Sequence, residues 1–471
     1  MTLHPTAARR RAAAPPRARR ALARSLALGV LALAALPVSL LAQHEHHAPA
    51  EDTAAAAHER HGAHGAPRPL GIPYERMGSG TSWVPDASPM YAIHAMPGEW
   101  TVMLHGVAYG VWNDQGGPRG DTQIGLIDWE MVMAMRPLAG GTLHLHAMTS
   151  LEPFVLGGRG YPLLMQTGES WRGEPLRDRQ HPHDLVMEVG AMYERALSPG
   201  TVATLYVAPV GEPALGPVAY MHRPSSDGDP FAPIGHHWQD ATHITYGVLT
   251  AGIGTRTVKL EGSLFNGREP DENRTDFDFD GAPLLDSWSA RLNVNPSARW
   301  SLAAYFGRLG GPEPDHPDEP VRRVGGSAQY VRRLAHGGHA AATLLTSANR
   351  HGDADHWEPS VLAEGSVTLM RGTTLFARTE WVRKSAEDLV LEGGGDEEEE
   401  FGVTSLSAGV VRDVVGLGGF SLALGARGNV ALLPEGLEAT YGSRTPAGVA
   451  VYLRLRPRLM AATAAMGADG G

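Results

Sequence analysis

The chain has 471 residues, of which 19% are charged, with 22 His and 16 Met but no Cys. Without cysteine, the sequence excludes a disulfide scaffold, a thiolate zinc site, a cysteine nucleophile, an iron–sulfur cluster and a lipid anchor on a cysteine. The formal charge is -11, and it reaches -18 (33 basic against 51 acidic residues) once the Arg-rich first 24 residues are set aside. Nucleic-acid binders need a basic face, so we predict no nucleic-acid partner.

The first 42 residues have the pattern of a cleaved secretory signal peptide. Seven Arg precede the apolar run from Ser25 to Leu41, and the small residue Ala42 follows that run. A single transmembrane anchor is the alternative, but Pro37 interrupts the run, which is also short for a bilayer. No later stretch reaches the roughly 18 consecutive apolar residues that a spanning helix needs. We therefore expect an exported protein that is either soluble or crosses a membrane as strands.

Residues 43–70 form a leader that we expect to be disordered, because it is rich in Ala, His and Pro and has almost no large apolar side chain. Its histidines suit either a flexible metal chelator or a soluble linker. They are His44, His46, His47, His58, His61 and His64. Residues 71–98 follow as an N-terminal extension or plug.

From Trp100 onward, apolar and polar residues alternate with the two-residue period of β-strands. Trp288 and Leu292, for example, alternate with Ser289 and Arg291. About sixteen such segments occur, and long helical periodicity is missing. Short connections, such as residues 198–200 and 254–256, alternate with long ones, such as residues 156–183 and 211–242.

This asymmetry of connections is typical of an up-and-down barrel in a bacterial outer membrane, whereas a β-sandwich has no reason for it. We predict an all-β transmembrane antiparallel barrel of about 16 strands over residues 99–458, followed by a tail at 459–471. Its long loops would be extracellular, and its short turns and both termini periplasmic. The apolar faces would meet outer-membrane lipid, the loops would meet lipopolysaccharide, and the barrel-assembly machinery would insert the chain. The polar faces would line an aqueous lumen.

Histidine and aspartate gather in two long loops near the N-terminal side of the barrel. Imidazole and carboxylate together suit zinc, copper, iron or nickel, so we consider these residues metal ligands, with zinc or copper favoured. The candidate ligands are His181, His183, Asp184, His222, His236, His237, Asp240 and His243. Two alternatives remain: the same residues pin the loops to the lumen wall, or they form a charged constriction in the pore.

Polar residues on the second to fourth predicted strands suggest a further ladder of ligands along a cation path. The lumen-lining residues of this ladder are Asp128, Glu130, His144, His146, Met148 and Glu188, with Met192 and Glu194 beyond them. On the same alternation, Met131, Met133 and Met135 should contact lipid.

Carboxylates alternate before a glycine in Asp276, Asp278 and Asp280, as at the start of a calcium loop. The twelfth position is Ser287 rather than Glu, so the match is partial. The acidic run at 396–400 fits a solvated loop tip or a place where divalent cations gather at lipopolysaccharide.

Four blocks of sequence resemble an uncharacterised family of exported bacterial proteins similar to outer-membrane β-barrels. The blocks are Arg76–Tyr91, Asp178–Asp184, Glu212–Thr250 (its residues 212–223 and 236–250) and Phe265–Asp278, and the resemblance spans about residues 71–310. It implies that these loops act as a unit and supplies no activity. More loosely, a His-rich leader before a barrel is similar in style to outer-membrane copper-resistance proteins, although the Met-rich repeats of those proteins are missing from this leader.

The sequence thus favours an outer-membrane pore or passive conduit that binds or passes transition-metal ions. One alternative is a surface metal-dependent hydrolase on a closed barrel, with His181, His183, His237, Asp240 and His243 as ligands. The other is a structural barrel without a transport role. We found no serine elbow, P-loop or dinucleotide glycine fingerprint in a strand-to-helix setting, which favours a protein that is not an enzyme.

Overall fold

The structure is a computed structural model that describes residues 68–279, 285–313, 316–369, 372–391 and 399–460. The predicted signal peptide, all but the last three residues of the predicted leader, and the predicted tail beyond Met460 lie outside the described residues.

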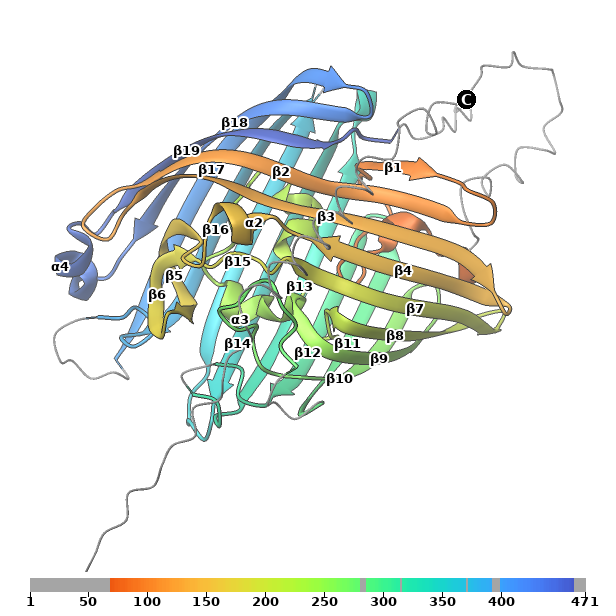
Figure 1. The fold of residues 1–471 in the computed structure, drawn as a ribbon, viewed down its shortest axis with the longest axis horizontal. Coiled ribbons are helices and arrows are strands. Elements are labelled where there is room, and N and C mark those ends of the chain that lie inside the picture. The colour runs from red at the N-terminus through yellow and green to blue at the C-terminus, as the bar shows by residue number, and fades with distance from the viewer. Residues whose placement is uncertain (1–67, 280–284, 314–315, 370–371, 392–398, 461–471) are drawn as a thin grey trace, which may run out of the picture. The chain divides into compact units, whose positions relative to one another are not determined.

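Sixteen antiparallel strands close into a ring, as the sequence predicted (Figure 1). The ring runs from β10 in chain order to β19, continues through β2, β3, β4, β7 and β8 to β9, and closes where β9 pairs with β10. The short strand β1 (Ala92–Ala95) lies outside this ring and pairs with the first part of β2. A hairpin of β5 (Tyr161–Trp171) and β6 (Glu174–Gln180) forms a separate two-stranded sheet.

The strands of the ring have the following bounds: β2 Thr101–Gln115, β3 Thr122–Leu138, β4 Gly141–Thr149, β7 Val186–Ser198, β8 Thr201–Gly211, β9 Thr245–Gly254, β10 Val258–Phe265, β11 Ser287–Ser297, β12 Trp300–Leu309, β13 Val321–Arg333, β14 His339–His351, β15 Glu358–Leu369, β16 Thr373–Ser385, β17 Glu400–Leu417, β18 Phe420–Leu432 and β19 Ala447–Pro457. The predicted alternation of connections is confirmed, since β3–β4, β7–β8 and β11–β12 are joined by tight turns and β4–β7 and β8–β9 by long segments.

Helices in the described residues are single turns. The α-helices are α2 (Glu152–Val155), α3 (His236–Gln239) and α4 (Glu438–Tyr441). The 3-10 turns are η4 Pro69–Gly71, η5 Tyr74–Arg76, η6 Tyr220–His222, η7 Pro224–Ser226, η8 Ala241–His243, η9 Ala335–Gly337 and η10 Glu435–Leu437. Within the part of the chain that the structure describes, no helix is long and apolar enough to span a bilayer.

The two faces of each strand differ as the alternation predicted. On β19, Val449, Val451 and Leu453 are exposed on the outside of the ring, whereas Tyr452 and Arg454 are buried on the inside. The same division holds on β11, where Trp288 and Leu292 face outward and Arg291 is buried. The barrel therefore presents an apolar belt outward and a polar wall inward.

Two long segments fill the interior: the first inserted loop (residues 150–185) and the second inserted loop (residues 212–244). Inward-facing side chains hydrogen-bond to the backbone carbonyls of these loops from many sides of the ring. The donors and acceptors are Asn113 Nδ2 to Pro162 O (2.6 Å), Arg291 Nη1 to Gly216 O (3.3 Å), Arg323 Nη2 to His237 O (2.6 Å), Ser366 Oγ to Pro224 O (2.9 Å), Arg378 Nη1 to Phe231 O (2.9 Å) and Tyr452 OH to Gly228 O (2.5 Å). Because these contacts come from β2, β11, β13, β15, β16 and β19, the loops are anchored across the whole lumen.

Residues 68–91 of the N-terminal extension also lie against the inner wall. The guanidinium of Arg68 donates two 3.0 Å hydrogen bonds to Glu194 on β7. Further along the ring, Asn295 Nδ2 on β11 donates to Val84 O (2.9 Å) and Ser301 Oγ on β12 donates to Trp83 O (2.9 Å). This segment therefore lies inside the ring, and its role as a plug stays a prediction.

Buried ion pairs supply a second set of anchors for the second inserted loop. Asp227 lies between Arg454 and Arg456 of β19, with oxygen-to-nitrogen distances of 3.1 and 2.6 Å. Burial raises the pKa of Asp227, but the two arginines outweigh burial and hold the pKa below its usual range. Asp229 in turn contacts Arg427 of β18 at 3.1 Å and Arg378 of β16 at 3.5 Å.

Replacement of Asp227 by Asn should destabilise the folded barrel by about 3 kcal/mol, because it leaves the buried guanidinium of Arg456 without its counter-charge and leaves Arg454 with Asp413 alone. We expect a lower urea midpoint for loss of the heat-modifiable, folded form in gel electrophoresis. Asp355→Asn, at an exposed loop position, is the matched control and should leave the midpoint unchanged. Equal midpoints for the two variants would contradict the anchoring role.

Glu212, at the start of the second inserted loop, should make stability depend on pH. Burial raises its pKa to about 8, against the opposing effect of Arg291. Between about pH 5 and pH 8, Glu212 is then protonated in the folded protein but ionised in the unfolded chain. The free energy of unfolding therefore falls as pH rises through this range, by at most about 1.4 kcal/mol per pH unit.

The variant Glu212→Gln should lack this fall in stability with rising pH, because its side chain does not titrate. Its urea midpoint should match that of the wild type near pH 4 and exceed it increasingly toward pH 8. Glu99→Gln, whose side chain is 72% exposed, should show no such trend. A constant difference between Glu212→Gln and the wild type across this range would disprove the assignment.

Candidate functional site

The eight predicted metal ligands lie in the two inserted loops. His181, His183 and Asp184 follow β6 in the first loop. In the second loop, η6 carries His222, α3 carries His236 and His237, Asp240 follows α3, and η8 ends at His243. Both loops are held by the wall contacts described above, so these side chains have fixed positions within the lumen.

The structure brings five of the eight together in one group, the histidine cluster (His181, His183, His236, His237 and His243). Ring centroids are separated by 5.1 Å for His236–His243, 5.2 Å for His236–His237, 5.4 Å for His183–His243, 5.5 Å for His181–His237 and 6.1 Å for His181–His236. The cluster thus joins residues that are about 60 positions apart in the sequence.

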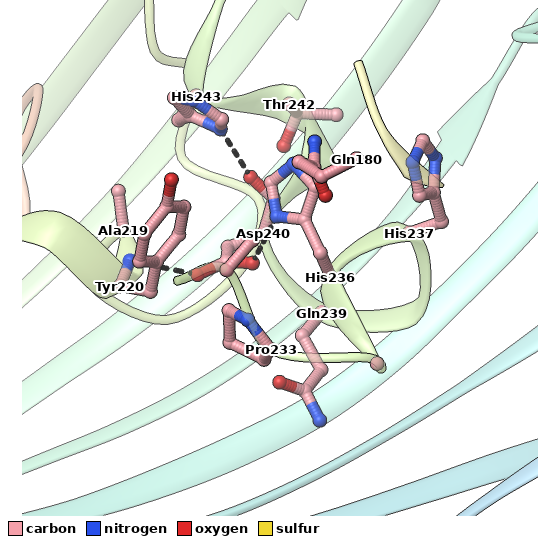
Figure 2. A network of polar contacts seen from close by, with 12 residues as sticks. Gln180, Ala219, Tyr220, Pro233, His236, His237, Gln239, Asp240, Thr242 and His243 are labelled. Carbon is pink, nitrogen blue, oxygen red and sulfur yellow. Dashed lines mark hydrogen bonds and ion pairs between the residues drawn. The ribbon is translucent and has the colours of Figure 1, made fainter. Parts of the chain in front are cut away.

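Three members of the cluster, His183, His236 and His243, share one arrangement and form what we call the inner triad. In each, Nδ1 faces an oxygen atom: Glu152 Oε1 at 3.1 Å, Asp240 Oδ1 at 2.7 Å and the Asp240 carbonyl at 2.8 Å, respectively. An oxygen acceptor favours the proton on Nδ1 and leaves the lone pair on Nε2. Figure 2 shows His236 and His243 on either side of Asp240, with Tyr220 nearby.

The Nε2 atoms of the inner triad lie in buried surroundings. His243 Nε2 has no hydrogen-bond partner, and His183 Nε2 is 3.4 Å from the hydroxyl of Tyr220. His243 has the pattern of a metal-binding histidine, in which one nitrogen is held by an acceptor and the other is left for the ion. His183 differs, because its Nε2 contacts Tyr220 and its Nδ1 has no hydrogen bond despite the nearby Glu152.

The other two members of the cluster are paired with carboxylates of their own. His181 Nε2 is 3.1 Å from Glu169 Oε1, and His237 Nδ1 is 3.3 Å from Glu269 Oε1. The remaining His237 Nε2 is buried without a partner. Sequence reasoning missed these carboxylates, because Glu152, Glu169 and Glu269 come from three separate segments with no spacing that relates them to the histidines.

The electrostatics of the cluster favour neutral imidazoles at most positions. Burial lowers the pKa of His181, His236 and His243, and neighbouring histidines lower it further. Burial also opposes the charge on His183, but Glu152 outweighs it and raises the pKa of that imidazole. Burial raises the pKa of Asp240, whereas His236 and Arg223 lower it by more, so the carboxylate stays ionised.

Two of the three pairs in the inner triad have the spacing of zinc ligands. A zinc ion with Zn–N distances of about 2.0–2.1 Å keeps the ring centroids of its histidines about 5 Å apart, and the separations are 5.1 Å for His236–His243 and 5.4 Å for His183–His243. The triad is not among the groups of described residues whose ligand atoms all lie within 4.8 Å of one another, so its side chains would have to move to hold one ion together. Neutral imidazoles with fixed tautomers are also the form that zinc and copper bind.

The other predicted loop ligands lie elsewhere. His222 packs against Trp129 (4.5 Å between centroids) and His105 (6.1 Å). Asp184 is 3.7 Å from Arg274, and neither of its oxygens has a hydrogen-bond partner. Asp240 lies next to the histidine cluster, but its carboxylate oxygens already accept from His236 Nδ1 and from the backbone N of Tyr220. It therefore positions His236 and is not a free ligand.

The predicted calcium ligands are partly described. Asp276 and Asp278 lie with Asp271 in a group whose ligand atoms are all within 4.8 Å of one another, whereas Asp280 lies outside the described residues. His356, Glu358 and Glu400 form a similar group. Calcium binding here stays a prediction, and residues 396–398 of the predicted acidic tip also lie outside the described residues.

The residues predicted to line the lumen divide into two sets. His144, His146 and Met148 are buried on the inner face of β4, and Glu188 and Met192 are buried on β7. On β3, however, the assignment of faces was wrong. Met131, Met133 and Met135 are buried inside the ring, because they pack against the N-terminal extension and the second inserted loop rather than against lipid.

Asp128 and Glu130 accordingly fall on the other face of β3, which has no register shift against β2. Asp128 is buried because the start of the first inserted loop covers it, and its carboxylate accepts a hydrogen bond from Leu151 N (3.0 Å). Asp128 therefore anchors a loop, and neither acid shares a face with His144 and His146.

Comparison with known proteins finds similarity in the fold of the barrel but none in sequence families. No family model matches the sequence, and no curated protein matches it. Among solved structures, the chain is similar to a loop-deletion mutant of OmpT, an outer membrane protein of Vibrio cholerae (9% identity, 76% of this chain and 100% of that one, TM-score 0.45).

Two further similar structures are OmpF of Salmonella typhi (12% identity, 76% and 98% covered, TM-score 0.46) and an anion-selective porin from Comamonas acidovorans (11%, 76% and 99%, TM-score 0.45). Nothing about the solute of this protein follows from them, and the resemblance to an uncharacterised exported family stays a prediction.

Asp240 should be the residue that organises the second inserted loop, since it receives His236, Tyr220 N (2.8 Å) and Arg223 Nη1 (3.2 Å). In Asp240→Asn, we expect amide hydrogen exchange in residues 219–244 to accelerate about ten-fold or more, the equivalent of about 1.5–3 kcal/mol for a hydrogen bond to a charged group. The exposed control Asp353→Asn should exchange like the wild type. Unchanged exchange in Asp240→Asn would contradict this role.

Proposed function

We propose that this protein is an outer-membrane barrel that acts as a narrow conduit for a divalent transition-metal ion, zinc or copper, and that the inner triad binds the ion within the lumen. The observation that carries the proposal is the contact of His243 with both His183 and His236 across the two inserted loops, with an oxygen 2.7–3.1 Å from each Nδ1.

A bilayer location is supported by the apolar belt. Leu260, Leu344 and Leu453 are each more than half exposed on the outside of the ring, which is unfavourable in water and favourable in hydrocarbon. A closed ring also leaves no strand edge unpaired in lipid. Export across the inner membrane would depend on the signal peptide predicted at residues 1–42.

A narrow conduit is supported by the contents of the lumen. Sixteen strands enclose enough space for an aqueous channel, but the inserted loops and the N-terminal extension are bonded to the wall on many sides. A hydrated solute would therefore meet side chains throughout, and a metal ion would move by exchange between ligands. The five imidazoles of the histidine cluster, in contact with one another, offer such successive ligands.

The metal-dependent hydrolase would use several of the same ligands and stays a prediction, because no described contact distinguishes a nucleophile or a substrate pocket beside the inner triad. The structural barrel is the outcome left if neither ion binding nor conductance is found.

The test is conductance of the full exported chain in a planar bilayer during titration with Zn²⁺ or Cu²⁺. We expect small conductance steps that either ion reduces at low concentration, because a bound ion occupies the constriction. In a His183→Ala, His236→Ala, His243→Ala triple variant, the concentration for half-block should rise by about 100-fold or more. His336→Ala, in the exposed β13–β14 turn, is the matched control.

Two results would contradict the proposal. One is a wild-type conductance that does not respond to either ion, and the other is the same half-block concentration in the triple variant and in the wild type. The heat-modifiable gel shift of each variant shows that its barrel is folded.

A further inference from the structure

Methionine and histidine face the lumen in rows that cross three neighbouring strands. The register places His105 of β2 opposite Met131 of β3, and Met131 opposite Met148 of β4. The next row is Met103, Met133 and His146. Side chains directly opposite in an antiparallel sheet have Cβ atoms about 4.5–5.5 Å apart. Six thioether and imidazole groups therefore share one patch of the inner wall.

A second group of the same residue types faces this patch from inside the lumen. Met77 and Met90 of the N-terminal extension and Met221 of the second inserted loop pack against the methionines of the wall. His222 follows Met221 and contacts His105, with 6.1 Å between ring centroids. A cavity of about 200 Å³ lies between the two groups, and we call it the Met–His chamber. Its lining includes Met103, His105, Met131 and Met133 of the wall and Met77, Met90, Met221 and His222 of the second group, but not His146 or Met148.

Two histidines of the wall have nitrogens without a partner. His146 Nδ1 is held by Glu188 Oε1 at 3.0 Å, and its Nε2 is buried without a hydrogen-bond partner. The side chain of His146 is 1% exposed. His105 Nε2 is likewise buried without a partner. His105 lines the chamber, so an ion there would satisfy its Nε2, which an apolar core leaves unsatisfied at a cost in free energy.

The distribution of methionine does not follow from packing alone. Eight of the sixteen methionines of the chain belong to this one cluster or pack against it. The outward face of the same strands uses branched residues instead, such as Leu104, Val132 and Leu145. Methionine is a general filler of gaps, but its thioether is also a soft, neutral ligand.

We propose that the Met–His chamber is a binding site for a soft monovalent ion, Cu(I) or Ag(I), with thioether ligands from Met103, Met131 and Met133 and an imidazole ligand from His105. Soft thioether donors select Cu(I) over zinc and over the hard cations. Burial inside the plugged lumen keeps water from competing for the ion.

This site is separate from the inner triad but adjoins it. The lining of the chamber includes His183 and Tyr220, so the two sites share a boundary. Soft-ion binding in the chamber does not depend on conduction through the triad, so each can fail alone.

The experiment uses the full exported chain in detergent under anaerobic conditions, with Cu(I) delivered from a chromophoric chelator that competes for the ion. We expect tight binding by the wild type and an affinity at least about ten-fold weaker in Met103→Leu, Met131→Leu, Met133→Leu, because leucine keeps the volume and removes the sulfur. Met165→Leu, an equally buried methionine in another cluster, is the matched control and should bind like the wild type.

X-ray absorption at the copper edge gives a readout that does not rely on the variants. Sulfur ligands in the Cu(I)-loaded wild type support the chamber, and a shell of nitrogen and oxygen alone overturns it. Absence of Cu(I) binding, or equal affinity in the Leu triple variant and in Met165→Leu, also overturns it. The triple Ala variant of the inner triad should keep its Cu(I) affinity while losing metal block, which separates failure of the chamber from failure of the conduit.

Discussion

Closure of an antiparallel sheet into a ring imposes one requirement on which the rest of this molecule depends. The inner face of every strand carries polar side chains, and these must find partners inside the ring. In an open channel, water would be that partner. Here the partners are the backbone of the two inserted loops and a set of buried carboxylates. Arg378 and Arg454 of the wall, for example, pair with Asp229 and Asp227 of the second inserted loop. The rigid placement of the histidine cluster follows from this substitution of protein for water.

The same substitution explains why the site is built from loops and completed by distant carboxylates. If a loop were held only at its two ends, its imidazoles would have neither a fixed tautomer nor a fixed direction. His183 and His236 have both, because Glu152 and Asp240 each hold one ring nitrogen. Orientation of this kind is what turns a histidine-rich loop into a candidate ligand set.

The barrel was predictable because its signal is local and repeated. The alternation of apolar and polar residues marks the two faces of each strand, and tight turns alternate with long connections along the barrel. The histidine cluster was partly predictable, since the loop histidines are conspicuous in the sequence. Their partners Glu169 and Glu269 were not, because pairing there is set by how the loops fold within the ring.

The assignment of faces on β3 failed for a related reason. Both faces of that strand carry residues that suit either environment, with acids on one side and methionines on the other. Alternation shows that two faces exist but does not say which one meets lipid. The neighbouring strand β2 held the missing signal, since Met103 and His105 alternate in phase with Tyr109 and Asn113, which are buried on the inner face. Registration across strands, rather than the pattern within one strand, decides such cases.

The seam between the first and last strands of the ring joins the wall to the N-terminal extension. β19 pairs with the second half of β2, from Ala108 to Gln115, while β1 pairs with residues 102–105 of β2. The chain that leads into β1 runs along the inner wall, where Asn295 and Ser301 hold it. The pairing of β19 with β2 closes the wall around the extension and both inserted loops. Wall and contents are therefore one folded unit, because each supplies the hydrogen-bond partners of the other.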